Sequence, residues 1–434
     1  MSSALARQLE QTILAHRPMP VDVAWANEIV FPYYDGLSIC NLAPTALHLL
    51  DTRTPASVLG AAPLDRRLWE HLQGQVRRVV LFLSDGLGWQ LLGEIAAADP
   101  ATAQALADLT GDGTLTPITS VAPSTTAAAL PSIWTGAPPA ATGMLGTRLF
   151  LREFSTLVSM LHYTPVSGRH RPDVLEDWGL NMEAFVPLTT LGEALRSRRI
   201  PSYLLLQKDL LGSGLSRIMH RGIQHTVCHF GYTDMWVSLR ELLSQTRRKH
   251  CFVTVYWGAV DGVSHLYGTA TEQSITEIRR QLCDLRDVAL NAEAGDGRTL
   301  FMLAADHGHT PTPDYVNIAD HPPLAEALRC GLGGEGRFAH LYLRHDYRSP
   351  VIEYIRAHFA DRLACLVPSD ALCAGLFGSQ PPHPESGARL GDLTVIAREG
   401  WHIGDQARSP SGSTSRHGGL SAREMLAPLL MRIV

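Results

Sequence analysis

The chain has 434 residues, enough for one large α/β domain with insertions or for two domains. Its formal net charge is −5 and its charged residues form no block of one sign, which argues against a basic nucleic-acid-binding footprint. No apolar run reaches the roughly 18 residues that a membrane-spanning helix needs.

Residues 1–77 form an N-terminal extension that we expect to pack on the core, with helices predicted over about 3–16 and 64–75. The first of these helices is amphipathic and has no uninterrupted apolar core, so it does not resemble a signal peptide. The seven cysteines are widely spaced and form no CxxC pair, which argues against a disulfide framework. We therefore expect a cytoplasmic protein.

The first candidate functional residue follows the apolar run RVVLFLS at 78–84, which is typical of a buried parallel strand. Asp85 ends this strand and is followed by Gly86 and by a helical stretch, QLLGEIAAA. Open α/β sheets bind ligands at the carboxyl ends of their strands, so Asp85 is a candidate site residue. A capping role is the alternative, and locally it is equally compatible with the pattern.

A second strand, predicted at 115–121, leads into the segment PSTTAAALPSIW. Ser124, Thr125 and Thr126 precede alanines of high helix propensity, so the segment predicts a loop that turns into a helix. A helix N-terminus suits an anion such as phosphate. A hydroxyl there is usually an ordinary cap, but one that binds a metal ion loses its proton more easily and becomes a nucleophile.

Residues 145–190 do not continue the strand–helix alternation and are interpreted as an insertion. The alternation resumes with a helix at 189–200 and a strand at 201–207. It predicts an α/β fold with a central, mostly parallel sheet flanked by helices.

A further strand, CFVTVYW at 251–257, ends in the glycine-rich segment GAVDGVSHLYG. Asp261 and His265 are four residues apart, so on a helical turn they face the same way. A carboxylate and an imidazole that converge on one point make half of a Zn²⁺ site.

The strand predicted at 299–305 ends in Asp306, His307, Gly308 and His309. Three strands in succession therefore end in side chains that bind metals. Because caps and core histidines rarely gather at the same edge of three neighbouring strands, this arrangement favours a metal site.

Residues 310–400 hold a second insertion, with a strand at 336–344, a helix at 349–363 and a strand at 388–398. The polar, glycine-rich segment 408–419 is expected to be mobile unless something anchors it, and it contains His417. A last helix is predicted over 421–433.

Taken together, the motifs resemble the alkaline phosphatase superfamily, most closely its type I phosphodiesterase/nucleotide pyrophosphatase branch. The resemblance runs from about residue 78 to the end of the chain, which makes 78–434 the catalytic domain. It rests on LSDGLG, PSTTAAAL, DGVSHLYG, ADHGH and SRHGG, which contain in order Asp85, Thr126, Asp261, His265, Asp306, His307 and His417.

The resemblance implies two divalent metal ions, Zn²⁺ or Mn²⁺, at the carboxyl edge of a central sheet. The first ion is expected on Asp85, Asp306 and His307 together with the Thr126 hydroxyl. The second is expected on a separate set of ligands, which are Asp261, His265 and His417. Thr126 is the implied nucleophile, because the family nucleophile is the last hydroxyl of the P-x-x-T segment, and a phospho-threonine intermediate is expected.

The sequence departs from that family at Ala129, where an asparagine that contacts a phosphate oxygen often stands. His309, Arg148 or a backbone amide could replace this phosphate or substrate contact. The expected function is that of a two-metal hydrolase of small-molecule phosphate esters, namely a phosphodiesterase/nucleotide pyrophosphatase-like enzyme. A phosphomonoesterase, a phosphonate hydrolase and a catalytically silent binding protein remain alternatives. The oligomeric state is not indicated.

Overall fold

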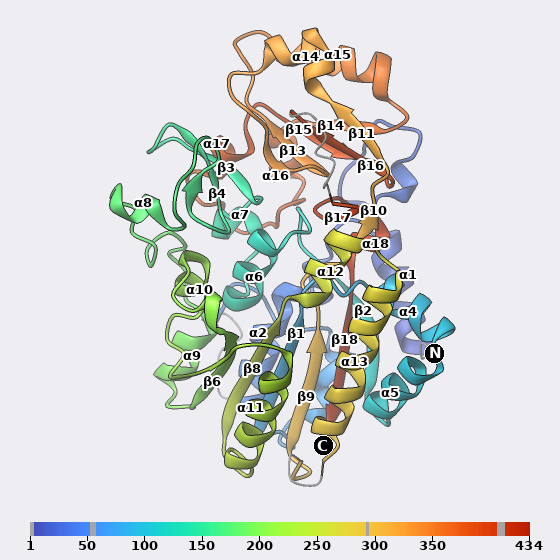
Figure 1. The fold of residues 1–434 in the computed structure, drawn as a ribbon, viewed down its shortest axis with the longest axis vertical. Coiled ribbons are helices and arrows are strands. Elements are labelled where there is room, and N and C mark those ends of the chain that lie inside the picture. The colour runs from blue at the N-terminus through green and yellow to red at the C-terminus, as the bar shows by residue number, and fades with distance from the viewer. Residues whose placement is uncertain (1–3, 53–57, 292–294, 406–412) are drawn as a thin grey trace.

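The computed structural model describes residues 4–52, 58–291, 295–405 and 413–434, and its centre is a seven-stranded sheet (Figure 1). The strand order is β2-β18-β9-β1-β8-β6-β7. Strands β9, β1, β8, β6 and β7 run parallel, and β18 lies antiparallel between β2 and β9. The bounds are β1 Arg78–Ser84, β2 Thr114–Thr119, β6 Ser202–Gln207, β7 His225–His229, β8 Cys251–Trp257, β9 Thr299–Ala304 and β18 Leu426–Ile433.

The central strands are apolar along their whole length because both faces of the sheet are covered. Every residue of β1 and β9 is buried. Helices α5, α13 and α11 pack side by side on one face, and α2, α6 and α9 on the other (Figure 1). Such continuous burial explains why these strands show no alternation of polar and apolar residues. The predicted α/β fold with a mostly parallel sheet is therefore confirmed.

The helices of the described residues are short to medium in length. Their bounds are α1 Ala4–Ala15, α2 Leu42–Leu50, α3 Arg66–Trp69, α4 Trp89–Ala98, α5 Pro100–Thr110, α6 Thr126–Thr135, α7 Pro139–Thr142, α8 Val174–Asp177, α9 Leu191–Ser197, α10 Gly214–Met219, α11 Tyr232–Gln245, α12 Ala259–Tyr267, α13 Glu272–Ala289, α14 Pro322–Ala327, α15 Arg348–Phe359, α16 Pro368–Cys373, α17 Ser386–Leu390 and α18 Ala422–Met425.

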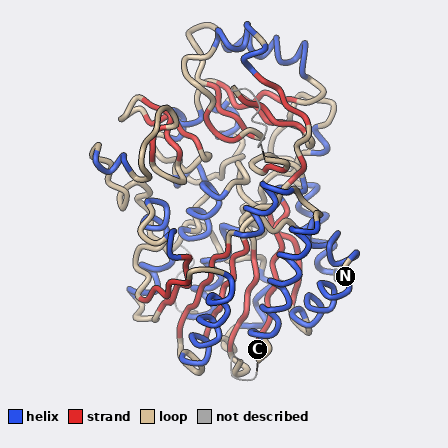
Figure 2. The backbone as a smooth tube through the Cα atoms, viewed as in Figure 1, coloured by secondary structure: helices blue, strands red, loops and turns tan. Residues whose placement is uncertain are grey.

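The two segments interpreted as insertions, 145–190 and 310–400, meet in a second seven-stranded sheet, seen in the upper half of Figure 2. Its order is β14-β15-β13-β12-β3-β4-β5, and the paired strands are antiparallel. Part of it has its own apolar core under α14 and α15. The bounds are β3 Arg148–Leu151, β4 Thr156–Ser159, β5 Thr164–Pro165, β12 Gly333–Glu335, β13 Phe338–Leu341, β14 Leu363–Leu366 and β15 Leu393–Ala397.

Two short ribbons connect these layers, β10–β17 and β11–β16. Their bounds are β10 Thr310–Pro311, β11 Asp314–Asn317, β16 Trp401–Gly404 and β17 Ser415–Arg416. The ribbon β10–β17 holds the end of the 408–419 segment beside the residues that follow β9. Residues 408–412 of that segment lie outside the described residues.

The prediction of a last helix over 421–433 is wrong. Helix α18 ends at Met425, and the rest of the segment is β18, whose first six residues are buried. A run of apolar residues that is covered on both faces suits a central strand as well as a buried helix, so periodicity does not separate the two. Pairing with β2 and β9 decides the outcome.

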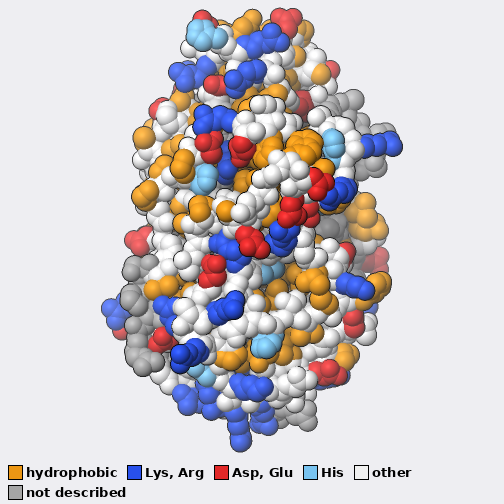
Figure 3. Space-filling model, turned by 90° about the vertical axis from the view of Figure 1, so that its left-hand side faces the viewer, with side chains coloured by type: hydrophobic (Ala, Val, Ile, Leu, Met, Phe, Trp, Pro, Cys, Tyr) orange, Lys and Arg blue, Asp and Glu red, His pale blue; other side chains and the backbone are white. Residues whose placement is uncertain are grey.

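Two smaller expectations also change. The helix predicted over 64–75 is two short turns, α3 and a 3₁₀ turn at Glu70–Leu72, and the start of the strand predicted at 388–398 is helix α17. No helix of the described residues is long and apolar enough to cross a membrane. The face seen in Figure 3 carries acidic and basic side chains interspersed with apolar ones, with more basic side chains at its lower end.

Candidate active site

The candidate site lies at the carboxyl ends of three adjacent strands. In the sheet, β1 lies between β8 and β9, with Ser84 opposite Trp257 and Leu83 opposite Ala304. This register places Asp85, Asp306 and the start of α12 at the same edge. Gly86 takes a positive φ of 75°, and a Cβ there would come within 2.8 Å of the Asp261 backbone, so only glycine permits this close approach.

Thr126 is the first residue of α6 and enters the site from a different layer. Its Oγ1 lies 3.4 Å and 3.5 Å from the two carboxylate oxygens of Asp85 and 3.1 Å from Nε2 of His307. The neighbouring Thr125 points elsewhere, because its hydroxyl donates to Glu335 over 2.8 Å. The structure thus brings Thr126, rather than Thr125, to the carboxylates.

The first cluster consists of Asp85, Asp306, His307 and Thr126. His307 Nε2 lies 3.4 Å from Asp85 Oδ1 and 3.5 Å from Asp306 Oδ2. Ligand atoms about 2.0–2.1 Å from a tetrahedral zinc ion are about 3.3–3.4 Å from one another. The separations in this cluster, 3.1–3.5 Å, are close to this value, so these side chains could hold one metal ion.

The second cluster consists of Asp261, His265, His309 and His417, whose ligand atoms lie within 4.8 Å of one another. Three Nε2 atoms converge on Asp261 Oδ1, at 3.5 Å from His265, 3.6 Å from His417 and 2.7 Å from His309. The first two distances are again close to the edge of a zinc tetrahedron. His309, which we considered as a phosphate contact, is instead fully buried in this cluster.

Each of the four histidines is oriented through its other ring nitrogen. Nδ1 of His265 lies 3.0 Å from the carbonyl of Ser415, that of His417 lies 3.2 Å from the carbonyl of Ser124, and that of His307 lies 3.1 Å from the carbonyl of Gly308. A carbonyl only accepts, so Nδ1 carries the proton and Nε2 keeps its lone pair. This tautomer is the one in which Nε2 binds a metal ion.

The same argument applies to His309 through a hydroxyl. Ser415 Oγ donates its single proton to the carbonyl of Ser264 over 2.6 Å, so it accepts from His309 Nδ1 at 3.2 Å. Burial lowers the pKa of His309 to about 4, so at neutral pH its Nε2 lone pair faces Asp261 Oδ1. Two electron-rich atoms 2.7 Å apart repel each other unless a proton, as in a hydrogen bond, or a metal ion lies between them.

The carboxylates repel one another as well. Burial, with the charges of Asp306 and Asp261, holds the pKa of Asp85 well above its usual range. Burial likewise raises the pKa of Asp306 to about 7. Burial opposes ionisation of Asp261 too, but the hydrogen bond with His309 and the charge interactions with His309, His417 and His265 hold the pKa of Asp261 below its usual range.

One buried oxygen atom of Asp306 is compatible with a bound cation. Asp306 Oδ1 accepts from the backbone N–H groups of Gly86 and His307, over 3.1 Å and 2.9 Å. Its Oδ2 is buried and has no hydrogen-bond partner in the structure, yet it faces His307 Nε2. Buried polar atoms are normally satisfied, so this oxygen, the crowded carboxylates and the free Nε2 atoms together fit divalent ions.

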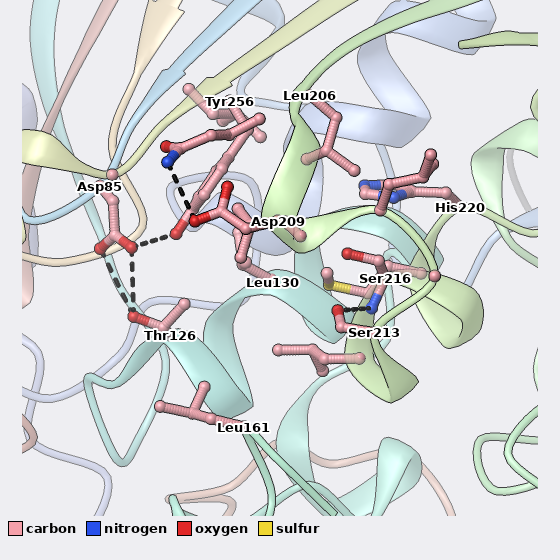
Figure 4. Close-up of a pocket in the computed structure, with 18 of the residues that line it drawn as sticks. Asp85, Thr126, Leu130, Leu161, Leu206, Asp209, Ser213, Ser216, His220 and Tyr256 are labelled. Carbon is pink, nitrogen blue, oxygen red and sulfur yellow. Dashed lines mark hydrogen bonds between the residues drawn. The ribbon is translucent and has the colours of Figure 1, made fainter. Parts of the chain in front are cut away.

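A cavity of about 710 Å³ opens beside the first cluster, with Asp85 and Thr126 in its wall (Figure 4). Helix α6, the segment from β6 to α10, and the end of β8 supply most of its lining. Figure 4 shows Tyr256 donating to Asp85, and Asp209 drawn between this end of the cavity and the end marked by Ser216 and His220.

The sequence-predicted residues thus divide into two groups. The structure brings Asp85, Thr126, Asp261, His265, Asp306, His307 and His417 together, with His309 among them. Arg148 does not join them, since it is exposed on β3 in the second sheet and outside the cavity lining.

Sequence reasoning missed Tyr256, Glu335 and Asp209. The sequence gives a weak indication for Tyr256, because its hydroxyl lies near the end of a predicted central strand. Glu335 and Asp209 come from distant segments and carry none. For His309 a signal exists, because residues two apart in extended backbone share a face with one another.

Residues 79–420 match the family described as type I phosphodiesterase/nucleotide pyrophosphatase. No curated protein matches the chain. Among solved structures, murine ectonucleotide pyrophosphatase/phosphodiesterase 5 is similar with a TM-score of 0.60 and 14% identity, over 82% of this chain and 88% of that one. The human protein of the same name gives a TM-score of 0.58 and 15% identity, over 82% and 87% of the two chains.

Phosphonoacetate hydrolase from Sinorhizobium meliloti 1021 is also similar, with a TM-score of 0.59 and 18% identity, over 83% of this chain and 91% of that one. At these identities the structural matches establish a shared fold. The sequence match, which spans most of the chain, establishes more, and it agrees with the clusters at the sheet edge. This protein belongs to the type I phosphodiesterase/nucleotide pyrophosphatase family, in the alkaline phosphatase superfamily, and family membership supports the hydrolysis of phosphate esters.

Proposed function

We propose that this protein is a two-metal phosphodiesterase that acts through a covalent intermediate on Thr126. The observation that carries the proposal is the position of the Thr126 hydroxyl within 3.1–3.5 Å of Asp85 and His307, at the wall of a large cavity. A threonine-to-alanine form of the murine structural neighbour is described as inactive and in complex with AMP, which agrees with this role.

The proposed ligand sets differ in one residue from the sets that the family resemblance implies. Asp85, Thr126, Asp306 and His307 would hold the first ion. Four protein ligands, namely Asp261, His265, His309 and His417, would hold the second, because His309 Nε2 faces the same oxygen of Asp261 as the other two histidines do.

Bound in these sites, two divalent ions would supply Lewis acidity toward phosphoryl oxygens and lower the pKa of the Thr126 hydroxyl. Thr126 then attacks phosphorus, so that its Oγ–P bond forms while the P–O bond to the leaving alcohol breaks. Water next attacks the phosphothreonine, which breaks the Oγ–P bond, releases a phosphomonoester and returns a proton to Thr126.

Other residues support these steps. Tyr256 donates to Asp85 and orients this carboxylate toward Thr126. The N-terminus of α6, which begins at Thr126, offers its positive dipole end to the phosphoryl oxygens.

A diester is favoured over a monoester by the charges around the nucleophile. A monoester dianion presents a third charged oxygen, which needs a cationic partner. Among the residues that the structure describes, no Lys or Arg lines the cavity. Besides Asp85, a second carboxylate lies close by: Glu335 accepts from the hydroxyl of Thr125, the residue before the nucleophile, and from the Thr147 backbone N–H, each over 2.8 Å.

The test is the ratio of kcat/KM for bis(p-nitrophenyl) phosphate and p-nitrophenyl phosphate, measured on zinc-loaded protein. We expect the diester to be preferred, and the Thr126→Ala variant to lose at least about 10³-fold in kcat/KM. Ser132→Ala removes a buried hydroxyl further along α6 and is the matched control, with activity close to that of the unchanged protein.

The other outcomes identify the alternatives. A monoester preference would make the protein a phosphatase. If both esters stayed intact while two ions were bound, hydrolysis of simple esters would be ruled out and a silent binding protein favoured. Activity that persisted in Thr126→Ala would remove the threonine intermediate from the account.

A further inference from the structure

The cavity beside Thr126 is much larger than a phosphoryl group needs. Its volume of about 710 Å³ lies in the range of sites for small organic molecules, about 300–1,000 Å³. Large apolar side chains make up much of the wall, including Leu130 and Trp134 of α6 and Leu206, Leu215 and Met219 of the β6–α10 segment. An organic substituent of the phosphodiester therefore has room here, and apolar surface to bury.

The charges in this wall are all of one sign. Asp209 and Asp173 line the cavity away from Asp85 and Asp261, the two carboxylates assigned to metal binding. Within the described part of the chain, no Lys or Arg side chain faces them in the lining. His220 adds no positive charge at neutral pH, because burial lowers its pKa to about 3.

Asp209 is the carboxylate best placed to meet a ligand. Asp173 is already used in the fold, since its Oδ1 accepts from the Gly214 N–H over 3.0 Å. Asp209 accepts from Gln207 over 3.2 Å and remains exposed. In Figure 4 it is drawn next to Tyr256, with Asp85 to one side and Ser213 to the other.

The nearest arginines do not change this charge balance. A smaller hollow of about 450 Å³ shares Leu206, Ser216 and His220 with the cavity and contains Arg217 and Arg221. Arg217 makes a two-pronged ion pair with Glu176, with both distances 2.8 Å. Arg221 lies 3.3 Å from Glu193 and also donates to backbone carbonyls of 186 and 188. Both cations are therefore already compensated.

We propose that this cavity receives the organic substituent of the phosphodiester, and that this substituent is an alkylammonium group whose positive charge lies near Asp209. The inference rests on the proposed phosphodiesterase function and names its substrate class. Trp134 and Tyr256 add aromatic rings to the wall, and aromatic rings favour cations. A carboxylated substrate, of which phosphonoacetate is an example, would meet aspartates without a compensating cation.

The experiment uses three p-nitrophenyl phosphodiesters of matched size. Their second substituents are 2-(trimethylammonio)ethyl, the isosteric and neutral 3,3-dimethylbutyl, and 2-carboxyethyl. Dissociation constants are measured by calorimetry on the zinc-loaded Thr126→Ala protein, which would leave the esters intact, and kcat/KM is measured on the unchanged protein. We expect the cationic ester to bind about tenfold more tightly than its neutral isostere, and the carboxylated ester to bind most weakly.

Asp209→Asn tests the residue itself. The amide keeps the shape and an acceptor for Gln207 but removes the charge, so the cationic ester should lose its advantage while the neutral ester binds as before. Asp112→Asn removes a charge from a side chain that is 92% exposed, outside the cavity lining, and should change neither ratio.

The outcomes separate the two proposals. The alkylammonium assignment would be overturned by any of three results. These are equal or tighter binding of the neutral ester, no binding of any of the three esters, and a ratio of cationic to neutral ester affinity that stays the same in Asp209→Asn. If binding followed the expected order but the unchanged protein hydrolysed none of the esters, the cavity assignment would stand and the phosphodiesterase function would fall.

Discussion

The two metal clusters share one sheet edge but are built differently. In the first, the side chains of Asp85, Asp306 and His307 are 5%, 2% and 0% exposed, and all three directly follow central strands. In the second, Asp261 and His265 are 20% and 30% exposed and lie on α12, while His417 comes from the segment after β17. His309, which is fully buried and follows β9 as His307 does, completes the second cluster. The second cluster therefore combines a buried histidine with more exposed residues from separate segments, and it depends on how these segments are held together.

The position of His417 in the second cluster depends on contacts between distant segments. Arg337 and Glu424 form a fully buried ion pair with a distance of 2.6 Å. Glu424 also accepts a hydrogen bond from the backbone N–H of Gly419 over 2.8 Å. Gly419 follows His417 by two residues. The second cluster therefore rests on a contact between the second sheet and the end of the chain, whereas the first is formed by residues that follow strands of the main sheet and by Thr126 of α6.

Asp306→Asn should have the largest effect, because it removes a buried charge from the first site. We expect kcat/KM to fall by about 10³-fold and the bound zinc to fall from two ions to one. The measurement is metal content after dialysis, together with diester hydrolysis. Asp314→Asn, on β11, is the matched control and should keep both ions. Two ions retained in Asp306→Asn would contradict the assignment of this carboxylate.

His309→Ala tests the fourth ligand of the second site. We expect zinc affinity at that site to fall by 10–100-fold or more, while the first site keeps its affinity. Cobalt substitution gives an independent readout, since the visible spectrum of the second ion should change with its coordination. An unchanged spectrum and affinity would show that His309 only packs against Asp261.

The pH dependence separates the clusters in another way. The raised pKa of Asp306, about 7, and the raised pKa of Asp85 mean that protons must leave before the first ion binds. Zinc affinity at the first site should therefore rise with pH by about tenfold per pH unit for each proton released, including the range below pH 7 in which Asp306 is still protonated. Calorimetry in buffers of different ionisation enthalpy measures this release, and affinity that is constant from pH 5.5 to 7 would refute it.

Ser415→Ala should have the smallest effect. It removes the hydroxyl that accepts from His309 Nδ1 but leaves the Ser415 carbonyl that orients His265. We expect a loss of up to about tenfold in zinc affinity at the second site, with no change at the first. A loss as large as that of His309→Ala would show that the hydroxyl, rather than the imidazole ligand, controls this site.

The same contrast explains what sequence alone could establish. Asp85 and Asp306 follow apolar runs that clearly predict buried strands. Because the carboxyl ends of parallel strands meet at one edge of a sheet, these two residues are expected to lie close together. His417 was placed only through the family resemblance, because its position depends on long-range contacts to β10 and Glu424. The prediction of a helix over 426–433 is wrong for the same reason. Only the pairing of this segment with β2 and β9 distinguishes a central strand from a buried helix.

The substrate cavity was beyond sequence reasoning altogether. Asp209 lies in a 3₁₀ turn after β6, and nothing in its local pattern distinguishes it from a surface aspartate. Its significance comes from the apolar side chains of α6 opposite it and from the absence of Lys and Arg in the described lining.

The central claim is that two ions bind at this edge, each with four protein ligands, and that Thr126 is one of those ligands. Anomalous diffraction at the zinc edge from crystals of zinc-loaded protein tests it most directly. The account predicts two peaks about 4 Å apart, one beside Asp85, Thr126, Asp306 and His307, and one beside Asp261, His265, His309 and His417. A single peak, or a first peak with Thr126 Oγ outside its coordination shell, would contradict it.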